Sequence, residues 1–157
     1  MKRLIFIVLI PLCAAIDAYS QPKALGLRLG YDCQVSYQHE VNEKADFLEV
    51  DMGMEVIGRG VNAACAYNFM LSSPDSVDKG GWRLYAGPAV KAGYMWVGGY
   101  IAVGAQLGLE YDFDFPLQFS IDIRPAVGMA MEGRYAFLFG AEALFGSIPC
   151  LSLRYRF

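Results

Sequence analysis

The chain offers few residues that could form a catalytic or metal-binding centre. Its only histidine is His39, and the one serine close to it is Ser36, three residues earlier. Successive side chains of a strand point to opposite faces, so this pair would lie on opposite sides of an extended segment. Cys33, Cys65 and Cys150, the cysteines beyond the N-terminal segment, lack the spacing of metal ligands. We therefore expect no catalytic residue, no cofactor and no metal, and hence no enzyme.

Charged residues occur instead at alternate positions, on one side of segments whose other side is apolar. Twelve of them follow this pattern: Arg28, Glu49, Asp51, Glu55, Arg83, Lys91, Glu110, Asp112, Asp122, Arg124, Arg154 and Arg156. Acids and bases nearly balance, and side chains fill the lumen of an eight-stranded barrel, so in such a lumen the charges would neutralise one another. We expect a structural network of ion pairs. A catalytic pair of carboxylates is the alternative, but no two acids stand out.

The segments that carry these charges alternate strictly between two kinds of residue. From 101 to 113 the odd-numbered residues are all apolar or aromatic, and the even-numbered ones are small, polar or acidic. A period of two predicts strands with one apolar face. We expect eight strands, near 24–31, 33–40, 46–57, 60–71, 81–95, 99–113, 116–127 and 146–157. A second interpretation joins 24–38 into one strand and makes 134–144 the seventh.

Aromatic pairs mark the ends of three strands, in the stretches CAYNF, LEYDF and LRYRF. Their tyrosines at 67, 111 and 155 are separated by equal steps of 44 residues. One step corresponds to a hairpin with its connections, so the same end of every second strand carries an aromatic pair. Such rings at one level are typical of the interface girdles of outer-membrane barrels. The predicted girdle consists of Tyr67, Phe69, Tyr111, Phe113, Tyr155 and Phe157.

These patterns predict an all-β fold, an eight-stranded antiparallel up-and-down transmembrane β-barrel. An open sheet edge would leave backbone groups without partners in hydrocarbon, so the last strand must pair with the first. We expect this requirement to be the reason that the sequence ends on an apolar-and-charged alternation, LSLRYRF, with no polar tail.

The composition fits this fold and limits the partners. The chain is 55% hydrophobic with a mean hydropathy of +0.31, yet beyond the N-terminal segment no uninterrupted apolar run approaches 18 residues. A basic start, a short apolar stretch and Ala18-Tyr19-Ser20 indicate a signal peptide over 1–20, which leaves 21–157 as one barrel domain. The net charge of −3 argues against a nucleic-acid partner.

Four stretches resemble a known group of proteins: ALGLRLGYDCQVSYQHE, WRLYAGPAVKAGY, LGLEYDFDFPLQFSIDIRP and LSLRYRF. They are similar to the small outer-membrane β-barrel proteins of Bacteroidetes-type bacteria, in the OmpX/OmpA-like eight-stranded class. The resemblance implies a Gram-negative outer membrane, contact with its lipids and lipopolysaccharide, and folding by the barrel-assembly machinery. That machinery would read a C-terminal signal, whose aromatic positions match Tyr155 and Phe157. The stretch AVGMAMEGRYAFLFGAEALFG departs from the pattern because it is too apolar for an external loop.

We therefore expect a non-enzymatic outer-membrane barrel that acts in envelope structure, adhesion or binding through external loops. One alternative is a lipid A-modifying enzyme, which would need a Ser/His or acid/His pair on the outward face near one rim. Another is a soluble periplasmic barrel of the lipocalin type, which would turn its apolar residues inward around a ligand. Alternation alone does not reveal which face points inward.

Overall fold

The computed structural model describes residues 22–55, 60–72, 80–95, 98–132, 135–140 and 148–157. The signal peptide expected over 1–20 lies outside the described residues. The described part is all-β, and its strands are β1 (Lys23–Leu29), β2 (Asp32–Glu40), β3 (Phe47–Glu55), β4 (Gly60–Ser72), β5 (Gly81–Met95), β6 (Gly98–Asp112), β7 (Leu117–Ile123), β8 (Ala126–Glu132), β9 (Tyr135–Phe139) and β10 (Cys150–Arg156). Among these residues no helix has the length and hydropathy needed to cross a membrane.

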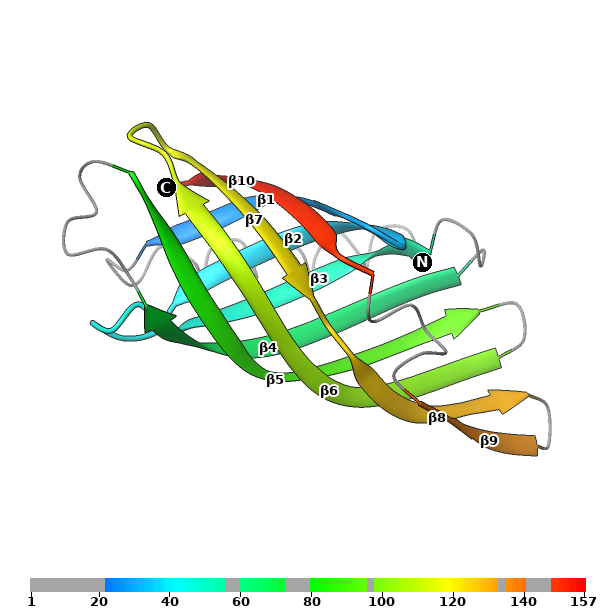
Figure 1. Cartoon of the computed structure of the whole chain (residues 1–157). Coiled ribbons are helices and arrows are strands. Elements are labelled where there is room, and N and C mark those ends of the chain that lie inside the picture. Colours follow the sequence, from blue (N-terminus) through cyan, green and yellow to red (C-terminus); the bar gives the residue numbers. More distant parts are fainter. Residues whose placement is uncertain (1–21, 56–59, 73–79, 96–97, 133–134, 141–147) are drawn as a thin grey trace.

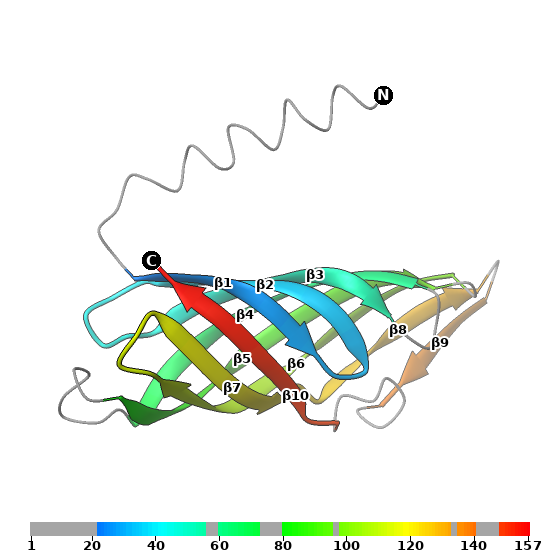
Figure 2. The same cartoon turned by 90° about the horizontal axis from the view of Figure 1, so that it is seen from above.

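The strands close into an antiparallel barrel (Figure 1). Neighbours follow the chain from β1 to β7, and β10 pairs with both β7 and β1, which completes the ring. Seen from above, β10 runs alongside β1 (Figure 2). Phe157 and Lys23 exchange backbone hydrogen bonds of 2.8 and 3.1 Å at the end of this seam. The predicted fold class, an eight-stranded antiparallel β-barrel, is confirmed.

The last two barrel strands are each divided in two. β7 and β8 pair with the same strand, β6, and form one barrel strand interrupted at Arg124 and Pro125. β8 pairs on its other side with β9, whereas β7 pairs with β10. The first six strands agree with the expected ranges within two residues, but the expected strand 116–127 is wrong in extent, and the preferred set of strands lacked β9. The second interpretation is wrong in joining 24–38, since a hairpin at 30–31 divides that range, but β9 lies within the strand 134–144 that it expected.

The register explains how the ring closes. A path around the ring steps from each residue to its paired residue on the next strand. Starting at Arg28, it passes through β2, β3, β4, β5 and β6 and reaches Ala130; in the opposite direction it passes through β10 and reaches Ser120. The two endpoints lie on the same barrel strand, ten positions apart, so the shear of this eight-stranded barrel is ten. An offset of this kind requires strands tilted from the barrel axis, by about 35–45° in typical barrels. An even offset also keeps side chains alternating in and out around the whole ring.

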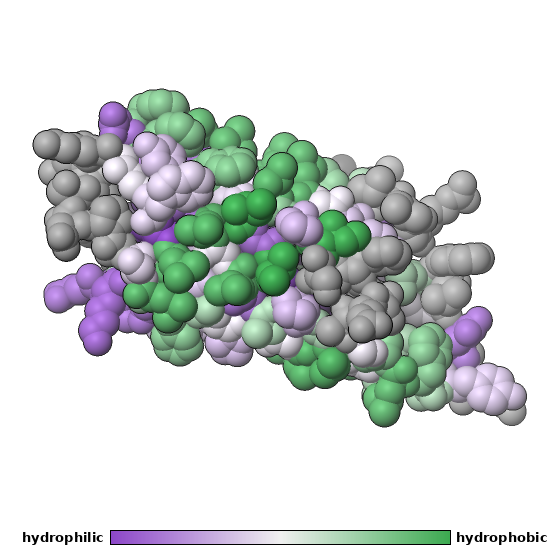
Figure 3. Space-filling view, viewed as in Figure 1, coloured by the Kyte–Doolittle hydropathy of each residue, from purple (hydrophilic) through white to green (hydrophobic). Residues whose placement is uncertain are grey.

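The apolar stripes point outward and the charged stripes inward. Leu107 and Leu153 are 46% and 52% exposed, whereas Glu49 and Arg154 are 0% and 1% exposed. Apolar side chains accordingly cover much of the face in Figure 3. Connections 41–46 and 113–116 lie at the end of the barrel that holds the C-terminus, called here the terminal end. The turn 30–31 lies at the other end, called here the hairpin end, where β3 and β5 also end and β4 and β6 begin. Residues 56–59, 73–79 and 96–97 lie outside the described residues.

Candidate functional site: a charged interior and an aromatic band

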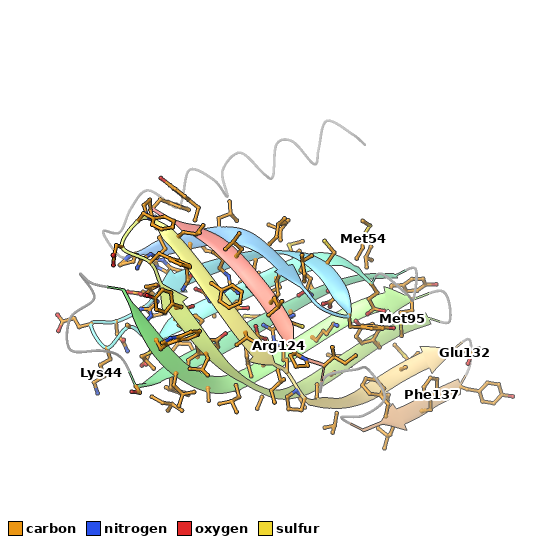
Figure 4. The ribbon with its side chains drawn as sticks, turned by 45° about the horizontal axis from the view of Figure 1, so that its top comes forward. Lys44, Met54, Met95, Arg124, Glu132 and Phe137 are labelled. Atoms are coloured by element: carbon orange, nitrogen blue, oxygen red, sulfur yellow. The ribbon has the colours of Figure 1, made fainter. Side chains whose placement is uncertain are left out.

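The centre of the interior is built around one glutamate. Glu49 on β3 lies 2.9 Å from Arg124 and 3.1 Å from Arg154, and the side chain of Gln38 donates to it at 3.0 Å. Arg124 also pairs with Asp51 at 2.8 Å. Ladder alternation turns these side chains to the same side of their strands, and ring closure brings them together from opposite walls. The arrangement joins β2, β3, β10 and the β7–β8 break, and Figure 4 labels Arg124 within the barrel.

A second group of charges lies toward the hairpin end. Arg28 pairs with Asp122 at 2.5 Å across β1 and β7, and it also lies 3.8 Å from Asp32. Lys91 on β5 completes this group, 3.0 Å from Asp32 and 4.0 Å from Glu55. A cavity of about 40 Å³ borders these groups. Since a water needs about 10–15 Å³, it has room for only a few waters.

A third group closes the interior at the terminal end. Arg83 on β5 pairs with Glu110 on β6, and it lies 3.0 Å from both Glu40 and Asp112. Arg156 lies 3.3 Å from Asp112, and its side chain is 26% exposed. This group lies at the terminal end of the barrel. Ion pairs, as well as the barrel wall, therefore close the interior at this end.

The structure brings all twelve charges predicted for the lumen into ion pairs. Ten are buried, and the side chains of Lys91 and Arg156 are half-buried, at opposite ends of the barrel. Sequence reasoning missed Asp32 and Glu40, which share these pairs. The signal was present, because both lie on the polar side of the alternation in β2, but the expected strand 33–40 left Asp32 outside and placed Glu40 at its last position. Within the described residues, no group of three or more His, Cys, Asp or Glu side chains is arranged to hold a metal.

Ser36 and His39 do not form a pair. Ser36 is fully buried and its hydroxyl accepts a 2.9 Å hydrogen bond from Arg154 in the interior. His39 lies on the outward side of β2, where it is half-buried. The two side chains therefore stand on opposite faces of the same strand.

The six residues predicted for a girdle all lie on the outward face at the terminal end. Ring contacts join Tyr67 to Phe69 and Tyr111 to Phe113, with centroids 5.1 and 4.9 Å apart. Tyr155 and Phe157 are 57% and 59% exposed. The sequence missed two further members, Trp82 and Phe115, which contact Tyr111 and Phe113. Trp82 is found through the register, which places it directly opposite Tyr111 on β6.

The turn beside this band holds one carboxylate with a shifted pKa. Asp46 accepts hydrogen bonds of 2.8 Å from both the Asn42 side chain and the backbone N–H of Met70. These two donors favour the ionised form and hold the pKa of Asp46 below its usual value. Asn42 in turn accepts from the backbone of Lys44 and of Asp46 itself, so the turn is built from local hydrogen bonds.

Compared with known proteins, the chain matches no family model, no curated protein and no solved structure at a significant level.

Proposed function

We propose that the chain is an integral β-barrel of a Gram-negative outer membrane with a non-enzymatic role in the envelope. One observation carries the proposal: the polarity of the barrel is the reverse of that of a water-soluble protein. Leucine, valine and methionine side chains are exposed all around the wall, whereas arginine, glutamate and aspartate fill the interior. Apolar surface on this scale is costly in water and favourable in hydrocarbon.

Strand length and the aromatic band support the same environment. β2 and β3 have 9 residues and β5 and β6 have 15, and a tilted strand needs about 9–11 residues to cross a bilayer. Tyr67, Tyr111 and Trp82 place rings with polar tips at one end of the apolar wall, as a membrane interface favours. The resemblance to small outer-membrane barrels rests on the same segments.

The two alternatives fit the geometry less well. A lipocalin-type barrel would line its lumen with apolar side chains, but this lumen holds Glu49, Asp51 and Arg154 at 0–1% exposure. A lipid A-modifying enzyme would need a Ser/His or acid/His pair on the outward face near one rim. His39 lies on the outward face of β2, whereas its neighbours Ser36 and Glu40 point to the interior.

A pair of leucine substitutions tests the proposal. Leu107→Arg at mid-strand places a charge in hydrocarbon and should cost about 2–4 kcal/mol, whereas Leu71→Arg near the terminal end of β4 should cost about 0–1 kcal/mol. Both leucines face outward, at 46% and 58% exposure. The measurement is the free energy of unfolding in phosphatidylcholine vesicles. Equal, near-zero costs would show that the wall is not in lipid.

The seam between β10 and β1 supports a further part of the proposal, assembly through the C-terminal aromatic residues. Deleting Phe157 removes the hydrogen bonds to Lys23 and the last ring of the band, so the folded amount in the outer-membrane fraction should fall several-fold. Refolding of the same variant into vesicles separates a lost assembly signal from a barrel that no longer closes. Wild-type amounts in the membrane fraction would contradict the assembly role.

A further inference from the structure

The pairing of strands in the barrel wall differs on the two sides of the break at Pro125. Arg124 and Pro125 belong to no strand, yet the backbone carbonyl of Pro125 still accepts a 3.1 Å hydrogen bond from Ala105, so β6 keeps its partner. On the other side the partner changes from β10 to β9. Figure 1 shows β8 and β9 continuing past β7 at the lower right. The three strands β6, β8 and β9 form a separate section of wall there.

The outward face of this section carries a groove of about 600 Å³. Its outward-facing lining side chains come from all three strands: Ile101 and Val103 from β6, Val127 and Met129 from β8, and Leu138 from β9. The remaining lining residues are Ala102, Gly128, Phe139 and Gly140, so among the residues that the structure describes no charged or hydrogen-bonding side chain lines the groove. The volume falls within the range of about 300–1,000 Å³ that small-molecule sites occupy.

Chemistry restricts what can occupy this groove. Leu138 is 84% exposed and Val103 is 56% exposed, and burial of such surface is favourable only against another apolar group. A polar ligand would lose its hydrogen bonds to water and find no replacement among the described lining residues, none of which has a polar side chain. The occupant must therefore be apolar over the length of the groove.

We infer that the groove binds one acyl chain of a membrane lipid, an inference that rests on the proposed function. The support is continuity: Ile101 and Val103 belong to the same outward stripe of β6 as Leu107 and Leu109, the stripe proposed to face hydrocarbon. Lipid that solvates this stripe reaches the groove directly. A concave site lined by three strands encloses a chain more fully than the rest of the wall, so this chain stays bound when others exchange.

Blocking the groove tests the inference. Val103→Trp combined with Leu138→Trp places two large rings on opposite sides of the groove, from β6 and β9. The matched control is Val35→Trp combined with Val61→Trp, at outward positions 53% and 58% exposed on β2 and β4, outside the groove lining. Each protein is refolded in detergent, incubated with dipalmitoyl phosphatidylethanolamine, and analysed by non-denaturing mass spectrometry. Wild type and control should each retain one lipid, and the blocked variant at least tenfold less.

The outcomes separate this inference from the function on which it rests. Equal retention by all three proteins, or no retention by the wild type, would overturn the acyl-chain site even if Leu107→Arg and Leu71→Arg still show a membrane barrel. Equal effects of Leu107→Arg and Leu71→Arg would instead contradict the proposed membrane environment of the barrel. A wild-type dimer that the blocked variant loses would show that a second copy occupies the groove, and that result also overturns the inference.

Discussion

Two consecutive stretches of one barrel strand have opposite chemistry on their inward side. In β7 the inward residues are Gln118, Ser120 and Asp122, all at most 2% exposed and packed against the polar interior. In β8 the inward positions hold Ala126, Gly128 and Ala130, and a charge, Glu132, occurs only at the last position. The register with β6 is the same on both sides of the break, so the change is one of residue type and not of facing.

The partner strands differ in the same way. β10 turns Ser152 and Arg154 inward beside β7, whereas β9 turns Phe137 and Phe139 to the inner side beside β8. Apart from Glu132 at the end of β8, the β8–β9 section is therefore apolar on both faces, and Phe137 on its inner side is still 46% exposed. From this comparison we infer that apolar and polar residues alternate along a strand only where the strand separates lipid from a charged interior. Beyond the last interior charges, residues on both faces of the strands are mostly apolar.

The largest effect should come from removing the central charge. Glu49→Ala takes away an acid shared by Arg124 and Arg154, and leaving buried guanidinium groups without this partner should cost about 3–5 kcal/mol. Glu132→Ala is the matched change at the inner side of the end of β8, where the glutamate is exposed, and should cost at most about 0.5 kcal/mol. Figure 4 labels Glu132 at this edge.

Urea unfolding of the vesicle-inserted barrel measures both costs. If Glu132→Ala destabilised the barrel as much as Glu49→Ala, the two sections would not differ in how they depend on charge. Glu49→Gln sharpens the result, because it keeps the volume and one acceptor while removing the charge. It should fall between the wild type and the alanine variant.

Glycine substitutions extend the comparison to packing. A Cβ on Gly108, in the part of β6 that faces β7, would lie 2.3 Å from the ring of Tyr85, which is fully buried. Gly108→Ala should therefore cost about 1–3 kcal/mol by overpacking. At Gly99, beside β8, the nearest atoms would be 3.8 Å away, so Gly99→Ala should be nearly neutral. The melting temperature of each variant in detergent is measured from the change in gel migration. Similar losses of stability in the two variants would mean that the interior around Gly108 is packed no more tightly than the end of the barrel around Gly99.

Much of this architecture could be predicted from alternation, and the limits have physical causes. Period-two patterning gives the facing of Glu49 or Leu107, because the facing depends only on local geometry. It does not give partners: Arg28 meets Asp122 only after the ring has closed with its offset of ten residues. The preferred set of strands stopped at 127 and lacked β9, because a segment that is largely apolar on both faces shows little alternation. Only the second interpretation placed a strand at 134–144.

The smallest effect concerns the turn 41–46 at the terminal end. Hydrogen bonds within the turn, and one from the backbone of Met70 on β4, stabilise it without ion pairs to the interior. The lowered pKa of Asp46 means that its ionised form stabilises the folded state. This contribution is complete above the usual aspartate pKa of about 3.9, and it is lost as the pH falls through the lower pKa of the folded protein.

Asp46→Asn should thus cost about 1 kcal/mol at neutral pH, and the cost should shrink as the pH falls below 4. Asp114→Asn, which removes the same charge in the turn 113–116 at the same end of the barrel, is the control. Unfolding free energies of the three proteins from neutral to acid pH measure the difference, and a cost for Asp46→Asn that did not change with pH would show that the Asp46 charge contributes nothing to the turn.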